Sequence, residues 1–354
     1  MDTVLIANRG EIACRIIRSC RQLGLATVAV YSEADAGSLH AELADQAFPV
    51  GPAAARQSYL DSERILEVAR SSGATAVHPG YGFLSENSGF ARAVEAAGLN
   101  WIGPHPDSID AMGDKERARA IAIESGVPVL PGSPRLTADT DAVVIQQAGD
   151  AVGYPLLVKA SAGGGGIGMK RVDDPSELLA VVTATQSMAG KAFADGTVFL
   201  ERYVANARHV EVQVFGDGAG QAVHFHERDC SLQRRYQKII EETRPPGIPA
   251  ETLDAMSAVA VRLCRHQRYR GAGTVEFVVD ADTHNYYFLE MNTRIQVEHP
   301  VTEQCAGVDL VAMQIELARG RLGGLDQKDI NHQGHAIVCR LYAADPGKYF
   351  MPLP

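Results

Sequence analysis

Glu276, Glu290 and Asn292 are the residues of this 354-residue chain whose types and spacing point most directly to chemistry. They stand in two stretches, 274–279 and 286–292, in which apolar and polar side chains alternate as in β-strands. A short polar segment joins the two stretches, so the pattern predicts an antiparallel hairpin. Two carboxylates and an amide oxygen on one face of such a hairpin suit a Mg²⁺ ion that bridges the phosphates of a nucleotide.

The register of this hairpin decides whether the two carboxylates meet. If Asp280 pairs with Tyr286, the carboxylates of Glu276 and Glu290 lie opposite each other. Asn292 then faces the same side. Opposed carboxylates are destabilising unless a positive group lies between them, which favours a metal site. The alternative is a solvated face with two unrelated acids, and the alternation alone does not exclude it.

A second polar group follows directly in the segment 293–303. If this segment is extended, the side chains of Arg294, Gln296 and Glu298 share one face. A guanidinium fork, an amide and a carboxylate can together hold a small planar oxyanion and remove a proton from it. The spacing therefore predicts an oxyanion-binding site.

Basic residues gather in the segment 228–238, which places Arg234, Arg235 and Lys238 within five positions. The formal net charge of the chain is −10, and in an acidic protein such a cluster favours an anion-binding pocket. A solvated basic face is the alternative.

The segment 163–168 is rich in glycine and contains the spacing G-x-G-x-x-G. A dinucleotide fingerprint must open a helix, whereas this loop precedes a stretch typical of a strand, and no Gly-Lys-Ser/Thr follows it. We interpret it as a flap between two strands whose backbone N–H groups close over phosphates. Lys159, in the preceding apolar strand, would then reach an α-phosphate. The alternative is a glycine-rich hairpin with a surface lysine.

Strands alternate with helices over the first hundred residues, which predicts a doubly wound parallel sheet. The turn after the first strand offers Gly10 alone rather than three spaced glycines, so a dinucleotide pyrophosphate has little room there. The expected strands are 3–7, 26–31 and 74–77, and the expected helices are 11–23 and 59–70.

Three prolines within residues 127–134 predict a domain boundary. Beyond it we expect a smaller module and then a strand-rich part. The expected helices are 141–149, one capped at 174–176, and 249–266; the expected strands are 155–160, 169–172, 197–200, 209–215, 222–227, 273–279 and 286–290.

Composition and charge narrow the possible partners and locations. The chain has 33 Lys and Arg against 43 Asp and Glu, which argues against nucleic acid or an anionic membrane as the main partner. No apolar run approaches the roughly 18 residues of a membrane helix, and the first residues lack the basic start of a signal peptide. We therefore expect a cytoplasmic globular protein.

The six cysteines show neither a CxxC pair nor a metal-ligand spacing, and the eleven histidines are scattered with no HxxxH on a helix. The interpretation that fits this pattern is reduced thiols in a protein core. A structural zinc site is not expected.

Four separated segments resemble biotin carboxylases, which are members of the ATP-grasp superfamily. They are 78–87, 159–161 with the glycine loop that follows, 227–242 and 290–303. The resemblance begins at residues 7–13 and extends to the end of the chain. It implies an α/β fold in which a doubly wound parallel sheet precedes a two-part ATP-grasp fold with a glycine-rich lid. The implied domains are a Rossmann-like N-terminal domain (1–113), a linker and lid subdomain (114–203) and an incomplete C-terminal catalytic subdomain (204–354).

The same resemblance implies a role for each candidate site residue. ATP would be held by Lys115, Lys159, Gly163, Gly164, Gly165, Gly166, Glu201, Arg202, Tyr203, Val204, His209, Gln233 and Tyr236. Mg²⁺ or Mn²⁺ would be bound by Glu276, Glu290 and Asn292. Bicarbonate would be held by Lys238, Arg294, Gln296 and Val297, with Glu298 as its base, and Arg340 would stabilise the biotin enolate.

The family's reaction phosphorylates bicarbonate with ATP to carboxyphosphate, which then carboxylates N1′ of biotin. It needs a metal for the phosphate charge, a base for bicarbonate and a cation for the enolate. The chain has no Ala-Met-Lys-Met biotinylation motif. Biotin is therefore expected on a carrier protein or domain, with a carboxyltransferase as a further partner and an acyl-CoA as the final acceptor. A homodimer or a larger complex is also expected.

Three departures from the family's pattern leave an alternative open. Tyr236 stands where many members have histidine, the glutamate usual before Asp345 and Pro346 is missing, and the chain ends before the family's C-terminal domain is complete. The alternative function is a truncated module that binds ATP without turnover. Another ATP-grasp ligase is disfavoured by the set of polar residues in the segment 293–303.

Overall fold

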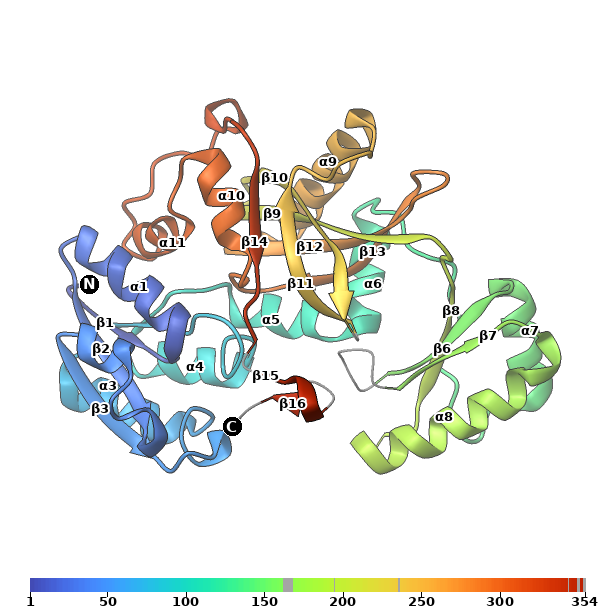
Figure 1. The fold of residues 1–354 in the computed structure, drawn as a ribbon, viewed down its shortest axis with the longest axis horizontal. Coiled ribbons are helices and arrows are strands. Elements are labelled where there is room, and N and C mark those ends of the chain that lie inside the picture. The colour runs from blue at the N-terminus through green and yellow to red at the C-terminus, as the bar shows by residue number, and fades with distance from the viewer. Residues whose placement is uncertain (162–167, 194, 235, 343, 349–350, 353–354) are drawn as a thin grey trace.

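The computed structural model describes residues 1–161, 168–193, 195–234, 236–342, 344–348 and 351–352. A five-stranded, a three-stranded and a six-stranded sheet follow one another along the chain, each with helices packed beside it (Figure 1). The predicted mixed α/β class is confirmed. The glycines 163–166 of the expected flap lie outside the described residues.

The first sheet is parallel, with the strand order β3-β2-β1-β4-β5, which confirms the predicted doubly wound arrangement. The sequence analysis missed β3, because this edge strand contains Pro49 and buries little more than Val50. The strands are β1 (Thr3–Ile6), β2 (Ala26–Ser32), β3 (Gln46–Gly51), β4 (Ala76–His78) and β5 (Asn100–Trp101). The helices are α1 (Gly10–Gln22), α2 (Leu39–Leu43), α3 (Ser62–Ser72), α4 (Ser88–Ala96) and α5 (Pro106–Gly113).

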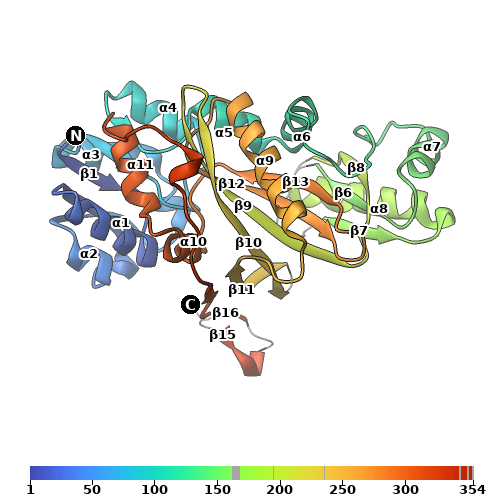
Figure 2. The same ribbon diagram turned by 90° about the horizontal axis from the view of Figure 1, so that it is seen from above.

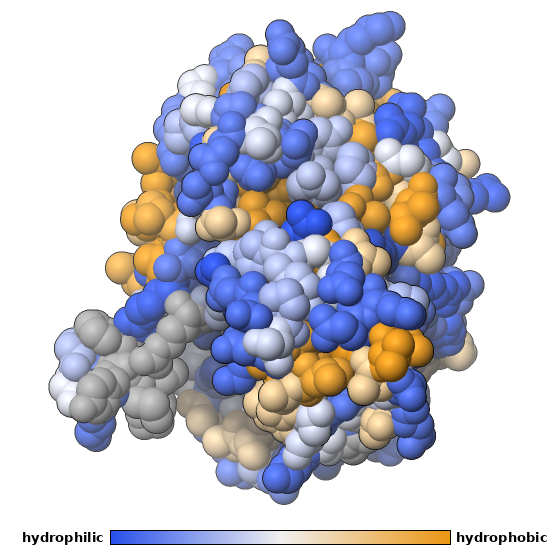
Figure 3. All heavy atoms as spheres, turned by 90° about the vertical axis from the view of Figure 1, so that its right-hand side faces the viewer, coloured by the Kyte–Doolittle hydropathy of each residue, from blue (hydrophilic) through white to orange (hydrophobic). Residues whose placement is uncertain are grey.

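The second sheet forms a separate lobe, drawn in green at the right of Figure 1. Asp141 caps the first helix of this lobe by accepting a hydrogen bond from the Val143 N–H. The face of the lobe seen in Figure 3 is mainly hydrophilic, with separate apolar groups. Its strands lie in the order β7-β6-β8, and its elements are β6 (Leu156–Ala160), β7 (Met169–Val172), β8 (Val198–Arg202), α7 (Ala142–Val152) and α8 (Leu178–Phe193). Helix α6 (Lys115–Glu124) precedes the lobe.

The third sheet is built around three long central strands, with the order β13-β12-β9-β10-β11-β14. Its strands are β9 (Ala207–Asp217), β10 (Ala222–Arg234), β11 (Gln237–Thr243), β12 (Arg270–Asp280), β13 (Tyr286–Asn292) and β14 (Ala336–Cys339). Helix α9 (Ala250–His266) covers one face of this sheet (Figure 2). Apolar side chains of the helix and of β9 belong to one buried cluster. Helices α10 (His299–Ala306) and α11 (Leu310–Ala318) follow, and a short ribbon is formed by β15 (Ala344–Asp345) and β16 (Met351–Pro352).

The predicted pairing of Glu276 with Glu290 is confirmed, although the reasoning that led to it was partly wrong. Tyr286 pairs with Val279 rather than with Asp280, and a bulge between Glu276 and Phe277 shifts the register by one residue. A bulge inserts one extra residue into one strand of a pair, and the sequence alternation gives no sign of it. Beyond the bulge, the two carboxylates lie opposite each other as expected.

The cysteines conform in part to the expected core thiols. Within the described residues all six are free, and four of them are buried, whereas Cys14 is half-buried and Cys339 is exposed on β14. No helix in the described ranges has the length and apolar character that a membrane crossing requires.

Gly216 on β9 shows how closely this sheet packs against the turn before β12. A Cβ added there would lie 2.1 Å from the carbonyl oxygen of Tyr269. We expect Gly216→Ala to lower the free energy of unfolding by about 1–3 kcal/mol through overpacking. Urea unfolding would measure it. Gly323→Ala is the control, because its Cβ meets no described atom within 4 Å; equal effects of the two substitutions would contradict the packing argument.

Candidate active site

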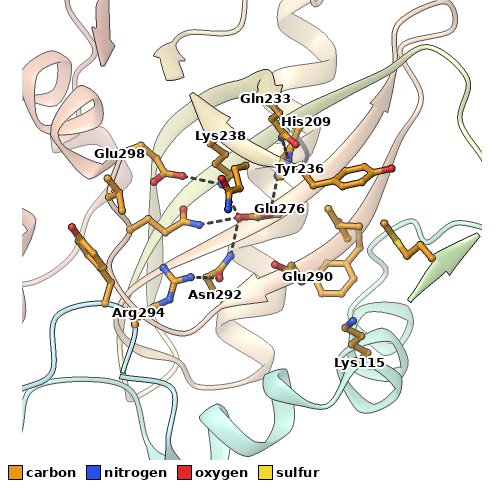
Figure 4. Close-up of a pocket in the computed structure, with 18 of the residues that line it drawn as sticks. Lys115, His209, Gln233, Tyr236, Lys238, Glu276, Glu290, Asn292, Arg294 and Glu298 are labelled. Atoms are coloured by element: carbon orange, nitrogen blue, oxygen red, sulfur yellow. Dashed lines mark hydrogen bonds and ion pairs between the residues drawn. The ribbon is translucent and has the colours of Figure 1, made fainter. Parts of the chain in front are cut away.

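A cavity of about 620 Å³ lies between the green lobe and the six-stranded sheet (Figure 4). Most of the side chains singled out in the sequence converge on it. The predicted residues that line it are Lys115, Lys159, Glu201, His209, Gln233, Tyr236, Lys238, Glu276, Glu290, Asn292, Arg294, Gln296, Val297, Glu298 and Arg340.

Three predicted ATP-binding residues, Arg202, Tyr203 and Val204, are not among the lining residues. Side chains alternate along β8, so Arg202 points away from the side that lines the cavity, and its Nε donates to the Val152 carbonyl oxygen at 2.7 Å. The ring of Tyr203 lies 4.3 Å from the guanidinium carbon of Arg171. The assignment of these three residues to ATP binding stays a prediction.

The lining also includes residues that the sequence analysis did not assign to the site. Most of the additional residues on the lobe side are apolar, and an apolar wall suits the faces of a planar ring. Apolar residues in a strand pattern indicate a core, so the sequence carried no separate signal for them. The lining residues that the sequence analysis did not assign are Tyr81, Gly82, Arg119, Ala160, Met169, Phe199, Gln237, Phe288, Leu289 and Tyr342.

The ammonium group of Lys238, on β11, is the centre of the polar end of the cavity. It donates to Glu211 at 2.6 Å, to Glu298 at 2.8 Å and to Glu276 at 2.9 Å. Burial lowers the pKa of Lys238, but the attraction of these carboxylates outweighs it and raises the pKa well above its usual value. Lys238 therefore stays charged and holds three acidic side chains together.

Arg228 is fully buried and lies next to this cluster of charged residues. Its guanidinium donates to Glu211 at 2.5 Å, to Gln213 at 2.7 Å and to Gln296 at 3.0 Å. Of the predicted basic cluster, Arg228 and Lys238 are thus placed inside the protein, whereas Arg234 is exposed and Arg235 lies outside the described residues. Lys238 lines the cavity and Arg228 does not, so the anion-pocket interpretation of this segment stays a prediction.

The partner of Arg228, Glu211, was missed because its signal is non-local. It is a single acidic residue in an apolar strand, and its two partners lie 17 and 27 positions away in the chain. A buried, unpaired carboxylate is strongly unfavourable, so an acid at an inward position of a central strand could have predicted buried cations nearby.

The carboxylate of Glu298 lies between two cations. One oxygen accepts from Lys238, and the other accepts from Nη2 of Arg340 at 2.8 Å. Burial raises the pKa of Glu298, but the attraction of Lys238, Arg228 and Arg340 is stronger and lowers it to about 2. A buried carboxylate that is ionised at neutral pH is thereby available as a proton acceptor.

The segment 293–298 is not extended, so the predicted backbone conformation was wrong. It turns after β13, because Ile295 is anchored in the apolar core, and Glu298 stands directly before α10. The side chains of Arg294, Gln296 and Glu298 nevertheless line one cavity, as the spacing predicted. A turn instead of a strand therefore brings together the side chains that the sequence predicts to bind an oxyanion.

Arg294 is fixed in place by residues on both sides. Its Nε donates to Glu86, which belongs to the loop after β4, at 2.9 Å, and its Nη2 donates to Asn292 at 2.8 Å. Burial lowers the pKa of Arg294, while the attraction of Glu86 raises it above its usual value. The first sheet thus contributes to the position of a guanidinium in the cavity.

Glu276 and Glu290 fit a divalent cation. Glu276 accepts hydrogen bonds from Lys238, Asn292 and Gln296, and the attraction of Lys238 and His209 overcomes burial and lowers its pKa well below the usual value. Burial, and then repulsion from Glu276, raises the pKa of Glu290. A raised pKa means that the negative charge at Glu290 is only partly compensated, and a cation at this position would relieve the repulsion.

Further cations and polar groups line the cavity, on the lobe and on the six-stranded sheet. Lys159 forms an ion pair with Glu201 across β6 and β8. Burial lowers the pKa of Lys115, at the start of α6. His209 interacts through Nδ1 with Gln233 at 2.8 Å, and Tyr236 lines the cavity although its side chain is 68% exposed. These groups could contact an elongated polyanion.

Comparisons with known proteins bear on this arrangement. Residues 1–109 match the family profile described as "Biotin carboxylase, N-terminal domain", and residues 114–324 match "Carbamoyl-phosphate synthase L chain, ATP binding domain". The chain is 47% identical over 351 residues to biotin carboxylase 1 of Bacillus subtilis (strain 168), an alignment that covers 99% of this chain and 78% of the relative. The chain belongs to the biotin carboxylase family. Relatives in this family are ATP-dependent ligases.

Other members of the biotin carboxylase family have different names and lengths. The alpha subunit of mitochondrial methylcrotonoyl-CoA carboxylase from Rattus norvegicus is 50% identical over 349 residues, which are 99% of this chain but 48% of that subunit. The biotin carboxylase domain dimer of 2-oxoglutarate carboxylase from Hydrogenobacter thermophilus, in complex with MgADP, ADP and bicarbonate, aligns with a TM-score of 0.91 and 44% identity. That alignment covers 99% of this chain and 77% of the solved chain.

The repulsion between Glu276 and Glu290 generates a prediction about metal dependence. Glu290→Gln removes one carboxylate ligand, so we expect the Mg²⁺ concentration for half-maximal nucleotide binding to rise at least about tenfold. A calorimetric titration of Mg²⁺ at a fixed ATP concentration measures this half-maximal Mg²⁺ concentration. Glu251→Gln, on the exposed side of α9, is the matched control. An unchanged Mg²⁺ dependence of Glu290→Gln would remove Glu290 from the metal site.

Proposed function

We propose that this protein carboxylates biotin with ATP and bicarbonate through carboxyphosphate, the first half-reaction of a biotin-dependent carboxylase. The observation that carries the proposal is the position of Glu298. Its buried carboxylate is held by Lys238 and Arg340 in the cavity that also contains Arg294 and the pair of opposed carboxylates. The residues proposed as base, oxyanion site and metal site therefore line one cavity.

Bicarbonate is expected to bind between Arg294 and Lys238, with Gln296 and Val297 beside it. Both cations can donate hydrogen bonds to its oxygens. The anion would share the positive charge that now acts on Glu298, so the pKa of Glu298 would rise from about 2 when bicarbonate binds. Glu298 would then become a more effective acceptor for the bicarbonate proton.

ATP is expected to extend from the apolar wall to the paired carboxylates. Lys115 and Lys159 would neutralise its phosphates, and His209, Gln233 and Tyr236 line the same cavity. Mg²⁺ held by Glu276, Glu290 and Asn292 would neutralise phosphate charge during transfer of the γ-phosphoryl group to bicarbonate. The flap predicted from the sequence for residues 163–168 would exclude water from the carboxyphosphate.

Arg340 is proposed to stabilise the enolate of biotin. Its Nε donates to Glu241 at 2.5 Å, and its Nη2 donates to one oxygen of Glu298. The ammonium group of Lys238 donates to the other oxygen of Glu298. A guanidinium fixed in this way offers a positive charge next to the bicarbonate position. The developing negative charge on the biotin ring would therefore form close to the carbon dioxide released from carboxyphosphate.

The relatives support a set of protein partners more closely than they support one final acceptor of the carboxyl group. A biotin carboxyl carrier, a carboxyltransferase and a second copy of the chain are expected, because this family functions in such complexes. The acyl-CoA acceptor and the cytoplasmic location remain predictions. Relatives named for methylcrotonoyl-CoA and for 2-oxoglutarate share similar identity with the chain, at 50% and 44%.

Substitution of the base tests the proposal. In Glu298→Gln the amide cannot accept the bicarbonate proton, so we expect bicarbonate-dependent ATP hydrolysis to fall about 100-fold or more while ATP affinity stays nearly intact. Steady-state kinetics and nucleotide titration measure the two quantities. Glu242→Gln, on the same edge of the sheet but paired with His335 outside the cavity, is the control. A Glu298→Gln protein with unchanged rate would exclude Glu298 as the base.

A further inference from the structure

Three histidines meet at a place that is separate from the cavity described above. His224 and His226 lie on β10, and His332 lies in the segment before β14. The ring centroids are 5.1 Å apart for the first pair and 5.2 Å apart for His226 and His332, and both pairs pack edge to face. None of the three lines the cavity of about 620 Å³.

The backbone of β10 brings a carboxylate to the same side as two of these histidines. In a regular strand His226 and Glu227 would point to opposite faces. The pairing of β10 with β9 shifts register between His224 and Glu227, and His226 has a φ of +63°. As a result, one ligand-capable atom from each of His224, His226 and Glu227 lies within 4.8 Å of the other two.

Hydrogen bonding leaves ligand atoms available in this cluster. Nδ1 of His226 is buried and has no hydrogen-bond partner among the described residues, which is unfavourable for a polar atom. The carboxylate of Glu227 accepts from Ser257 at 2.6 Å and from Arg244 at 3.2 Å. Each carboxylate oxygen has a second lone pair, so these bonds do not prevent coordination of a cation.

The charge of the surroundings favours a cation. Glu227 and Asp254 both lie near the guanidinium of Arg244, and two carboxylates against one guanidinium leave a net negative charge. Burial lowers the pKa of His224 to about 4 and also lowers the pKa of His226. Both imidazoles are therefore neutral at pH 7, which is the form that binds metal ions.

We propose that His224, His226 and Glu227 bind a divalent transition metal ion of the Zn²⁺ class. Two imidazoles and a carboxylate are a ligand set that suits zinc, with the fourth tetrahedral position open to water. His332 packs against His226, and its Nε2 lies 3.3 Å from the hydroxyl of Thr243. The ion would therefore strengthen the connection between β10, the end of β11 and the segment that leads to Arg340.

Binding of the metal alone to the whole chain tests this proposal. Mg²⁺ is present in large excess to occupy the carboxylate site of the cavity, and Zn²⁺ is then titrated by calorimetry. We expect one equivalent of Zn²⁺ to bind and the thermal midpoint of unfolding to rise with it. Co²⁺ is expected to give the visible absorption of a tetrahedral site. Absence of stoichiometric Zn²⁺ binding would overturn the proposal.

His226→Gly is the decisive variant, because glycine readily adopts the left-handed conformation that this position requires. It removes a ligand without demanding a new backbone, so we expect the fold to be kept and the Zn²⁺ affinity to fall more than about 100-fold. His224→Gln is the second variant, and it decides the question if His226→Gly is unstable without metal. His266→Gln, exposed at the end of α9, is the control and should bind Zn²⁺ normally. Wild-type affinity in folded His226→Gly or His224→Gln would contradict the proposed ligands.

Discussion

The polar end of the cavity depends on the attraction between the buried ammonium of Lys238 and three carboxylates. Without this cation, Glu211, Glu276 and Glu298 would repel one another in a region of low dielectric constant. Removal of one partner from a buried ion pair typically costs about 3–5 kcal/mol, because the remaining charge is left uncompensated. Lys238 therefore stabilises the arrangement of these three carboxylates, in addition to its proposed contact with bicarbonate.

The same attraction explains how the site can hold charge and still react. Each carboxylate around Lys238 also has a second cationic or polar partner, such as Arg228 for Glu211 and Arg340 for Glu298. The charges are thus in place before any substrate binds, and little reorganisation is needed during the reaction. An incoming oxyanion would redistribute existing hydrogen bonds, which links the binding of bicarbonate to the basicity of Glu298.

Local patterns predicted the fold class, most of the strands and the polar residues of the segments 274–279 and 286–298, but they missed helices such as α4, α5 and α11. Other residues of the cavity, such as Lys115, His209 and Arg340, were predicted from the family resemblance. The pairing of Glu276 with Glu290 was predicted from alternation, yet it holds only because a bulge compensates a register that was wrong by one residue. The turn at Ile295 was not predictable, since it depends on an apolar core formed by distant elements. Arg202 shows the opposite failure, because the strand period already placed it on the other face from Glu201.

Interactions between distant segments were beyond the sequence analysis. The buried pair of Glu211 and Arg228 joins two strands, and Glu211 has no motif of its own. Among the proposed zinc ligands Glu227 was hidden, because residues next to each other on a strand normally point apart. His224 and His226 are two positions apart and share a face in a regular strand, but it takes the unusual backbone at His226 and the shift in strand pairing to bring Glu227 to them. In both cases the three-dimensional arrangement supplies a partner that spacing along the chain does not indicate.

ATP hydrolysis by the whole chain with Mg²⁺, measured with and without bicarbonate and then with free biotin, addresses the proposed chemistry most directly. If Glu298 acts on bicarbonate and Arg340 on biotin, hydrolysis requires bicarbonate and becomes faster when biotin is added. ATP binding with no bicarbonate-dependent hydrolysis would contradict this account and would favour a module that binds the nucleotide without turnover.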